Sequence, residues 1–188
     1  MPLTKLDTVA ALVVIDLQKG VVGLPAAHPI GEIVGRTAQL ASAFRERGLP
    51  VVLVNVSGRA PGRTDAGPRK YSFPPDWNEL VPELQRHPSD YLVTKQRWGA
   101  FLGTDLDETL LQRGVTQVVL TGVATSAGVE STARSAHDLG YNVTLVVDAM
   151  TDFDAGSHSH SVEKIFPRLG ETAKTDDVLK LLQEASSA

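Results

Sequence analysis

Cysteine is absent from the 188 residues of this chain. Its absence excludes disulfide bridges, thiolate metal sites and cysteine nucleophiles, and it leaves the redox compartment undetermined. Long apolar runs are missing too, and the N-terminal residues lack the apolar stretch of a secretory signal. We therefore expect a soluble, cytoplasmic protein with no membrane partner.

Basic residues form no long run, and the formal net charge is -4, so nucleic acid is not expected as the main partner. No G-x-G-x-x-G or P-loop pattern follows an apolar run, which leaves a nucleotide-binding module poorly supported. The length and the hydrophobic content of 42% fit one globular domain spanning residues 1–188.

Short apolar runs alternate with stretches of helical periodicity along the chain. We expect apolar, buried strands at residues 8–16, 51–54, 118–120 and 142–147, a short strand at 91–94 and an edge strand at 172–174. We expect helices at 30–47, 104–111 with Thr104 as the cap, from 129 onward, at 156–166, and from 175 or 176 to 184. This alternation predicts an α/β fold with a doubly wound, mainly parallel sheet and helices on both faces. Residues 55–77 are too long for a simple connector and are a candidate lid or subunit-contact loop.

The segment 115–136 combines an apolar strand, a turn of small residues at 123–128 and a helix. Val129, Ala133 and Ala136 fall on one face of that helix. Amides of such a turn point past the carboxyl end of the strand, where α/β sheets bind ligands and where negative charge is favoured. An ordinary strand-to-helix connection explains the same pattern.

Three charged residues, Asp16, Lys95 and Asp148, stand where apolar strands stop. The carboxyl ends of parallel strands share one edge, so these groups can converge there. We expect Asp148 to accept hydrogen bonds from the amides that follow it. Asp16 and Lys95 either cap their strands or form a site, because a carboxylate and an ammonium held together can steer a proton.

Three motifs occur in order between residues 12 and 152: VVIDLQ, VTKQRWGAFLGTDLDETLLQRG and LTGVATSAGVESTARSAHDLGYNVTLVVDA. Together they resemble the isochorismatase-like hydrolases, a superfamily that includes nicotinamidases and N-carbamoylsarcosine amidases. The resemblance implies a Rossmann-like sheet of about six strands, a cis peptide bond at Val123–Ala124 and assembly into a homo-oligomer. It also implies the family triad of Asp, Lys and Cys, with the first two at Asp16 and Lys95.

The position that matches the family's nucleophilic cysteine is Gly128. Thiolate attack on an amide is therefore excluded, and Ser126 and Ser131 do not occupy the matching position. Isochorismatases of siderophore and phenazine pathways resemble this chain in lacking that cysteine. They hydrolyse a vinyl ether without a covalent intermediate.

The remaining chemistry is acid catalysis by Asp16. Apolar neighbours such as Val14, Val21 and Phe101 would raise the pKa of its carboxyl group, and Lys95 would oppose that rise. We expect Lys95 to orient the acid or a substrate carboxylate.

Five further residues are candidates for substrate binding. They are Gln18, Arg97, Val123, Ala124 and Thr125. A loop-stabilising hydrogen bond is an equal alternative for Gln18, and a surface ion pair is the alternative for Arg97. Trp98 is expected in the core or at a subunit contact.

Metal ligands are not expected. The stretch that holds an Asp and two His residues in nicotinamidases contains no histidine here, and His158 and His160 are interpreted as solvated. We predict an isochorismatase-like hydrolase that acts on a small anionic molecule without metal or other cofactor. The alternative is a catalytically inactive member that serves as a small-molecule binding or assembly protein.

Overall fold

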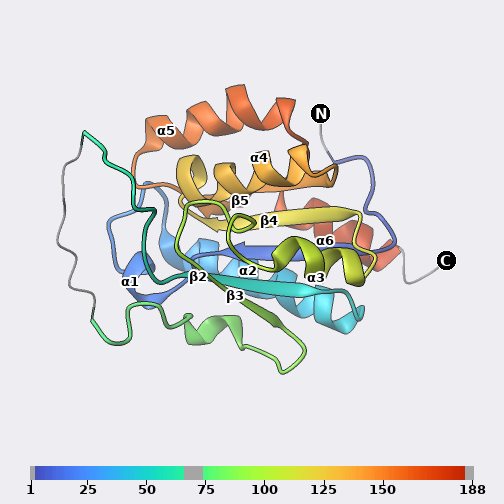
Figure 1. Ribbon diagram of the computed structural model, residues 1–188. Coiled ribbons are helices and arrows are strands. Elements are labelled where there is room, and N and C mark those ends of the chain that lie inside the picture. The colour runs from blue at the N-terminus through green and yellow to red at the C-terminus, as the bar shows by residue number, and fades with distance from the viewer. Residues whose placement is uncertain (1–2, 66–73, 185–188) are drawn as a thin grey trace.

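The computed structural model describes residues 3–65 and 74–184, and its centre is a six-stranded parallel sheet (Figure 1). The strands are β1 (Ala10–Ile15), β2 (Val51–Val56), β3 (Tyr91–Lys95), β4 (Gln117–Val123), β5 (Asn142–Thr151) and β6 (Glu171–Ala173). They lie in the order β3-β2-β1-β4-β5-β6, and each neighbouring pair is parallel. The predicted α/β fold is confirmed.

Strand β1 lies inside the sheet because its sequence is apolar on both faces. All six of its residues are fully buried. Successive side chains of a strand point to opposite faces, so Leu12 and Val14 enter one hydrophobic core while Val13 and Ile15 enter the other. A continuous run of Ala, Leu, Val and Ile therefore suits only a strand that is covered by helices on both sides.

Helices cover both faces of the sheet (Figure 1). They are α1 (Lys19–Val22), α2 (Ile30–Glu46), α3 (Leu106–Gln112), α4 (Glu130–Asp138), α5 (Ala155–His160) and α6 (Thr175–Glu184). Shorter turns are the 3₁₀ helices η1 (Pro82–Leu84) and η4 (Phe166–Arg168), and the π-helical turns η2 (Thr125–Val129) and η3 (Ser161–Ile165). Helices α1, α2 and α6 contribute to the first core, and α3 and α4 contribute to the second. The predicted inward face of α4 is confirmed, since Val129, Ala133 and Ala136 are fully buried.

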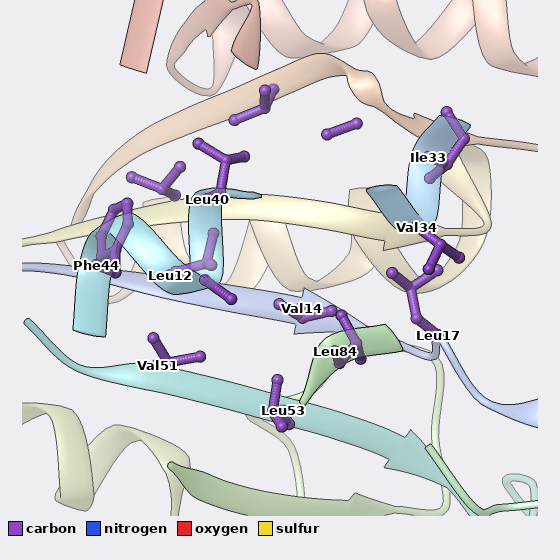
Figure 2. Close-up of a cluster of buried hydrophobic side chains, with 14 of the residues drawn as sticks. Leu12, Val14, Leu17, Ile33, Val34, Leu40, Phe44, Val51, Leu53 and Leu84 are labelled. Atoms are coloured by element: carbon purple, nitrogen blue, oxygen red, sulfur yellow. The ribbon is translucent and has the colours of Figure 1, made fainter. Parts of the chain in front are cut away.

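Figure 2 shows the first core, in which α2 packs on β1 and β2. Leu40 and Phe44 project from α2 toward Leu12 and Val51, and all four side chains are buried. Because core side chains are closely packed, this layer fixes where β1 ends and so where Asp16 stands.

The predicted cap of α3 is wrong. The helix begins at Leu106, and no side chain caps it. The Thr104 hydroxyl instead donates to the carbonyl oxygen of Ala100, inside the loop that precedes the helix. Its distance to the amide of Leu106 is 3.4 Å, too long for a good hydrogen bond.

Strand β5 is longer than predicted, because it continues through Asp148 to Thr151. A register shift opposite Leu120 and Gly122 lets the strand bend and pair with β4 again. Asp148 accepts hydrogen bonds from the amide and hydroxyl of Thr175, at 2.8 and 3.0 Å, so it caps the start of α6. Its predicted structural role holds, but the expected partners at residues 149–152 were wrong.

The predicted lid or subunit-contact loop, residues 55–77, includes residues 66–73, which lie outside the described residues. Its two flanks are described and reach the carboxyl edge of the sheet. Across residues 3–65 and 74–184, the helices are all too short or too polar to cross a bilayer.

Candidate active site

Asp16 and Lys95 meet at the carboxyl edge of the sheet. Asp16 directly follows β1, and Lys95 is the last residue of β3. The Lys95 Nζ atom donates to Asp16 Oδ2 at 2.7 Å, although the residues are 79 positions apart. The side chains are only 1% and 9% exposed, so this ion pair is buried.

The backbone of Asp16 has φ 51°, in the left-handed region that L-residues adopt rarely. Its amide still donates to the carbonyl oxygen of Val54 in β2, and its own carbonyl accepts from the Gln18 amide. The chain therefore leaves the sheet sharply at Asp16, at the mouth of a pocket. Such conformations persist where the surrounding structure enforces them and are common at functional sites.

Burial raises the pKa of the Asp16 carboxyl group to about 6, while the charge and the hydrogen bond of Lys95 oppose that rise. Within the described part of the chain, Asp16 Oδ1 is buried and has no hydrogen-bond partner. An ionised carboxylate with an unpartnered, buried oxygen is costly, which agrees with the direction of the shift. Of the three apolar neighbours named from the sequence, only Val21 lines the pocket beside Asp16.

The pocket has a volume of about 380 Å³. Most of its wall is apolar, and its cationic side chains are Lys95, Arg59 and Arg97. The remaining lining residues are Asp16, Val21, Leu24, Val56, Gly58, Trp77, Trp98, Val123, Ala124, Ala127, Gly128 and Phe153. Among the described residues of this wall Asp16 is the single acidic one, and it pairs with Lys95, so the pocket suits an anion that carries an apolar body.

Gly128 lies directly beside the acid. A Cβ atom built on this glycine would stand 2.9 Å from Cγ2 of Ile15 and 3.3 Å from Oδ2 of Asp16. The first distance is shorter than real carbon contacts allow, so even a methyl group would force a shift. Gly128 therefore packs tightly beside the carboxyl group, and both residues line the pocket.

The structure also brings Arg97, Val123 and Ala124 to this pocket, as the sequence suggested. The expected cis peptide bond at Val123–Ala124 is present. Arg97 also accepts a 3.2 Å hydrogen bond from Lys95 Nζ through its carbonyl oxygen. Both the position of its side chain and this bond tie Arg97 to the ion pair.

Two predicted binding residues lie away from the pocket. The Gln18 side chain is fully buried, donates to the carbonyl oxygens of Val56 and Trp77, and accepts from the Val56 amide. Its amide group is fully used in holding the loop, which is the alternative that the sequence left open. The Thr125 side chain is also fully buried and bonds to His158, so neither residue lines the pocket wall.

The interpretation of His158 as solvated is wrong. Its Nδ1 atom lies 2.8 Å from Thr125 Oγ1, and its ring packs against that of His28 with the centroids 4.5 Å apart. His160 is exposed. Residues 3–65 and 74–184 contain no cluster of three or more His, Asp or Glu side chains that could hold a metal ion.

Sequence reasoning missed several wall residues: Leu24, Arg59, Trp77 and Phe153. Each stands in an irregular loop whose path no periodicity reveals. Phe153 had one usable signal, because Asp152 ends an apolar strand just as Asp16 does. Trp98 is not in the core, since it is 68% exposed and lines the pocket, and its alternative place at a subunit contact stays a prediction.

Comparisons with known proteins agree with this fold and show the family of the chain. The isochorismatase domain family matches residues 10–177. YwoC of Bacillus subtilis (strain 168), an uncharacterized isochorismatase family protein, is 41% identical over 177 residues, which cover 90% of this chain and 92% of YwoC. The phenazine biosynthesis protein PhzD of Pseudomonas fluorescens is 30% identical over 154 residues, which cover 79% of this chain and 74% of PhzD.

Among solved structures, an isochorismatase family protein from Burkholderia thailandensis superposes with a TM-score of 0.91 at 44% identity. The match covers 95% of this chain and 98% of that protein. A family match over most of the chain and full-length relatives at this identity lead to one conclusion. The chain belongs to the isochorismatase family and is an isochorismatase-like hydrolase.

Proposed function

We propose that this hydrolase cleaves a small, anionic vinyl ether, with isochorismate as the favoured substrate, and that Asp16 supplies the proton. The observation that carries the proposal is the environment of the Asp16 carboxyl group. This group is buried, its pKa is raised to about 6, and it lines the pocket together with Gly128. At neutral pH a useful fraction of such a group is still protonated.

The reaction begins when the Asp16 carboxyl group gives its proton to the terminal carbon of the vinyl group. The electron pair of the double bond forms the new C–H bond and leaves an oxocarbenium ion. Water then adds to the cationic carbon and returns a proton to the Asp16 carboxylate. The resulting hemiketal breaks its C–O bond and releases a carbonyl compound and an alcohol, so no residue is bonded to the substrate at any stage.

Lys95 and Arg97 have distinct parts in this proposal. Lys95 holds the Asp16 carboxyl group in place at 2.7 Å and limits the rise of its pKa. Arg97 lines the pocket, and in this proposal its guanidinium binds a substrate carboxylate, which a planar guanidinium matches well. Val123 and Ala124 form part of the wall against which the substrate rests.

Gly128 and the family comparison support the absence of a covalent step. Without a thiol, the amidase route of the family's cysteine hydrolases is closed. The similarity to PhzD, which is named for phenazine biosynthesis, favours the cysteine-less isochorismatases as the relevant branch.

The test is a hydrolysis assay over isochorismate and other vinyl ethers, with amides and carbamoyl compounds as the comparison panel. We expect the wild-type chain to hydrolyse a vinyl ether and Asp16→Asn to lose about 10³-fold in kcat/KM, the usual size of a general-acid contribution. Asp7→Asn is the matched control, because Asp7 bonds to Thr116 and Asn142 at the opposite edge of the sheet.

Equal inertness of wild type and Asp16→Asn over the whole panel would overturn the proposal. It would favour the alternative, a catalytically inactive member that binds small molecules or serves in assembly. Full vinyl-ether activity in Asp16→Asn would instead show that another group supplies the proton.

A further inference from the structure

The turn at residues 123–128 forms one wall of the pocket, and its position must be held from behind. Val123, Ala124, Ala127 and Gly128 line the pocket, whereas the Thr125 side chain points into the protein and is fully buried. The turn therefore presents one side to a ligand and the other to the segment that follows β5. The residues that hold the buried side of the turn therefore also set the distance from this wall to Asp16.

Two side chains from the segment after β5 hold consecutive residues of the turn. His158 of α5 bonds through Nδ1 to Thr125 Oγ1 at 2.8 Å. Asp152 accepts from the Ser126 amide at 2.6 Å, and its other oxygen accepts from the amide of Phe153, a wall residue, at 2.8 Å. The turn and the opposite part of the wall are thus joined through this segment.

His158 is itself fixed by a third segment. The His28 ring packs edge to face on it, and His28 Nδ1 lies 2.9 Å from Thr151 Oγ1. Thr151 pairs with Val123 in the sheet, so the network returns to the residue at which the turn begins. Burial and the neighbouring His28 lower the pKa of His158, against the opposing effect of Asp152. The imidazole therefore stays neutral near pH 7, where either tautomer can bond to a hydroxyl group.

We propose that His158 is a positioning residue of this active site, which acts through Thr125 to hold the pocket-lining turn at its working distance from Asp16. It does not touch the pocket, so it is not a catalytic residue. The proposal rests on the proposed function only for its kinetic readout. A second readout, local hydrogen exchange, needs no substrate.

Two matched pairs of variants isolate the bond. His158→Leu removes the ring nitrogen, and His158→Asn keeps a polar group close to the position of Nδ1. Thr125→Val removes the hydroxyl group at nearly constant shape, and Thr125→Ser keeps it. His160→Leu is the control on the same helix, because His160 is exposed.

In His158→Leu and in Thr125→Val, we expect the amides of residues 123–128 to exchange about tenfold faster, the local effect of one lost hydrogen bond. Exchange in β1 should not change. His158→Asn, Thr125→Ser and His160→Leu should resemble wild type. The double variant should exchange no faster than either single one, because both remove the same bond.

For the kinetic readout, we expect kcat/KM in His158→Leu to fall by about 10–100-fold through kcat, as for a wall displaced by a fraction of an ångström. His158→Asn should recover most of it. Unchanged exchange of the turn in Thr125→Val, or additive effects in the double variant, would overturn the inference. If His158→Leu does not fold, the Thr125 pair decides the question alone.

The two proposals fail in distinguishable ways. Faster exchange of the turn in a chain that is inert toward vinyl ethers refutes the proposed function and leaves the positioning role standing. An active wild type whose turn exchanges normally in Thr125→Val refutes only the positioning role.

Discussion

The carboxyl group of Asp16 gives the activity a pH dependence with a definite sign. Its pKa is raised to about 6, and the proposed reaction needs the protonated form. We therefore expect kcat/KM to be constant below pH 5 and to fall about tenfold per pH unit above 6, as for any required acid. A pH series of initial rates measures this, and a rate that rises through pH 6 would make Asp16 a base.

The lysine opposes the effect of burial on Asp16, so removing its charge has a predictable consequence. In Lys95→Met the pKa of Asp16 should move above 6, because burial then raises it without the opposing charge and hydrogen bond of Lys95. The ¹³C chemical shift of the Asp16 carboxyl group, followed against pH, measures the change. A pKa that moves down would show that Lys95 does not stabilise the carboxylate.

The same pKa determines how Asp16 affects folding. The folded chain binds this proton more tightly than the unfolded chain, whose value is near 3.8. Its contribution to stability is therefore complete below pH 3.8 and is lost as the pH rises through about 6. The site thus carries its acid at a cost in stability at neutral pH.

Gly128 should tolerate no side chain. In Gly128→Ala the new methyl group would stand 2.9 Å from Ile15 Cγ2, and we expect a loss of about 1–3 kcal/mol in the free energy of unfolding. Urea unfolding measures this loss. Gly128→Cys meets the same obstacle, so it should not create an efficient amidase. A large amidase activity in that variant would show that only the thiol was missing.

At the level of single residues, the sequence predicted Asp16 and Lys95 because strand ends meet at one edge of a parallel sheet. It could not predict which polar side chains near the strand ends form hydrogen bonds inside the protein instead of facing the pocket. Gln18 and Thr125 follow strands just as Asp16 does, yet one is bonded to a loop and the other to His158. That outcome depends on loops whose course no local pattern encodes.

Among the elements, the close pairing of β4 with β1 depends on one glycine. Gly122 has φ 113°, and a Cβ atom there would stand 2.0 Å from the carbonyl oxygen of Ile15 in β1. Gly122→Ala must therefore push β4 away from β1, and we expect a loss of more than about 3 kcal/mol, in the range of severe core changes.

The matched control is Gly35→Ala in α2, where an added Cβ atom meets no atom within 4 Å. That change should stabilise the protein by up to about 1 kcal/mol, because alanine favours a helix. Thermal unfolding of both variants measures the contrast. Equal stability of Gly122→Ala and wild type would mean that the two strands can separate freely.

Apolar runs located the central strands β1, β2, β4 and β5, since burial on both faces leaves such a run, and local pattern also located the edge strands β3 and β6 and most helices. Element ends were less predictable. The cap of α3 and the length of β5 depend on tertiary contacts, namely the Thr104 bond to Ala100 and the return of β5 to β4. Neither contact has a signature in the local sequence.

At the scale of the whole molecule, the two cores share the central strand. Leu12 packs in one core and Val13 in the other, so neither core can form without β1. We expect a single cooperative unfolding transition for residues 1–188. Tryptophan fluorescence and far-ultraviolet circular dichroism should give the same curve, and two separate transitions would contradict one folding unit.

Assembly stays a prediction at this scale. If the chain is a homo-oligomer, its unfolding midpoint should rise with protein concentration by mass action. Analytical ultracentrifugation gives the stoichiometry.

The distance of 79 residues between the two members of the buried ion pair has a consequence for biosynthesis. While the chain grows on the ribosome, Asp16 emerges long before Lys95 and is an ordinary carboxylate in water. Its pKa rises to about 6 only after folding has buried it, and Lys95 of β3 then limits that rise. Folding therefore creates the weak acid that the proposed reaction needs, and under that proposal a nascent chain is inactive.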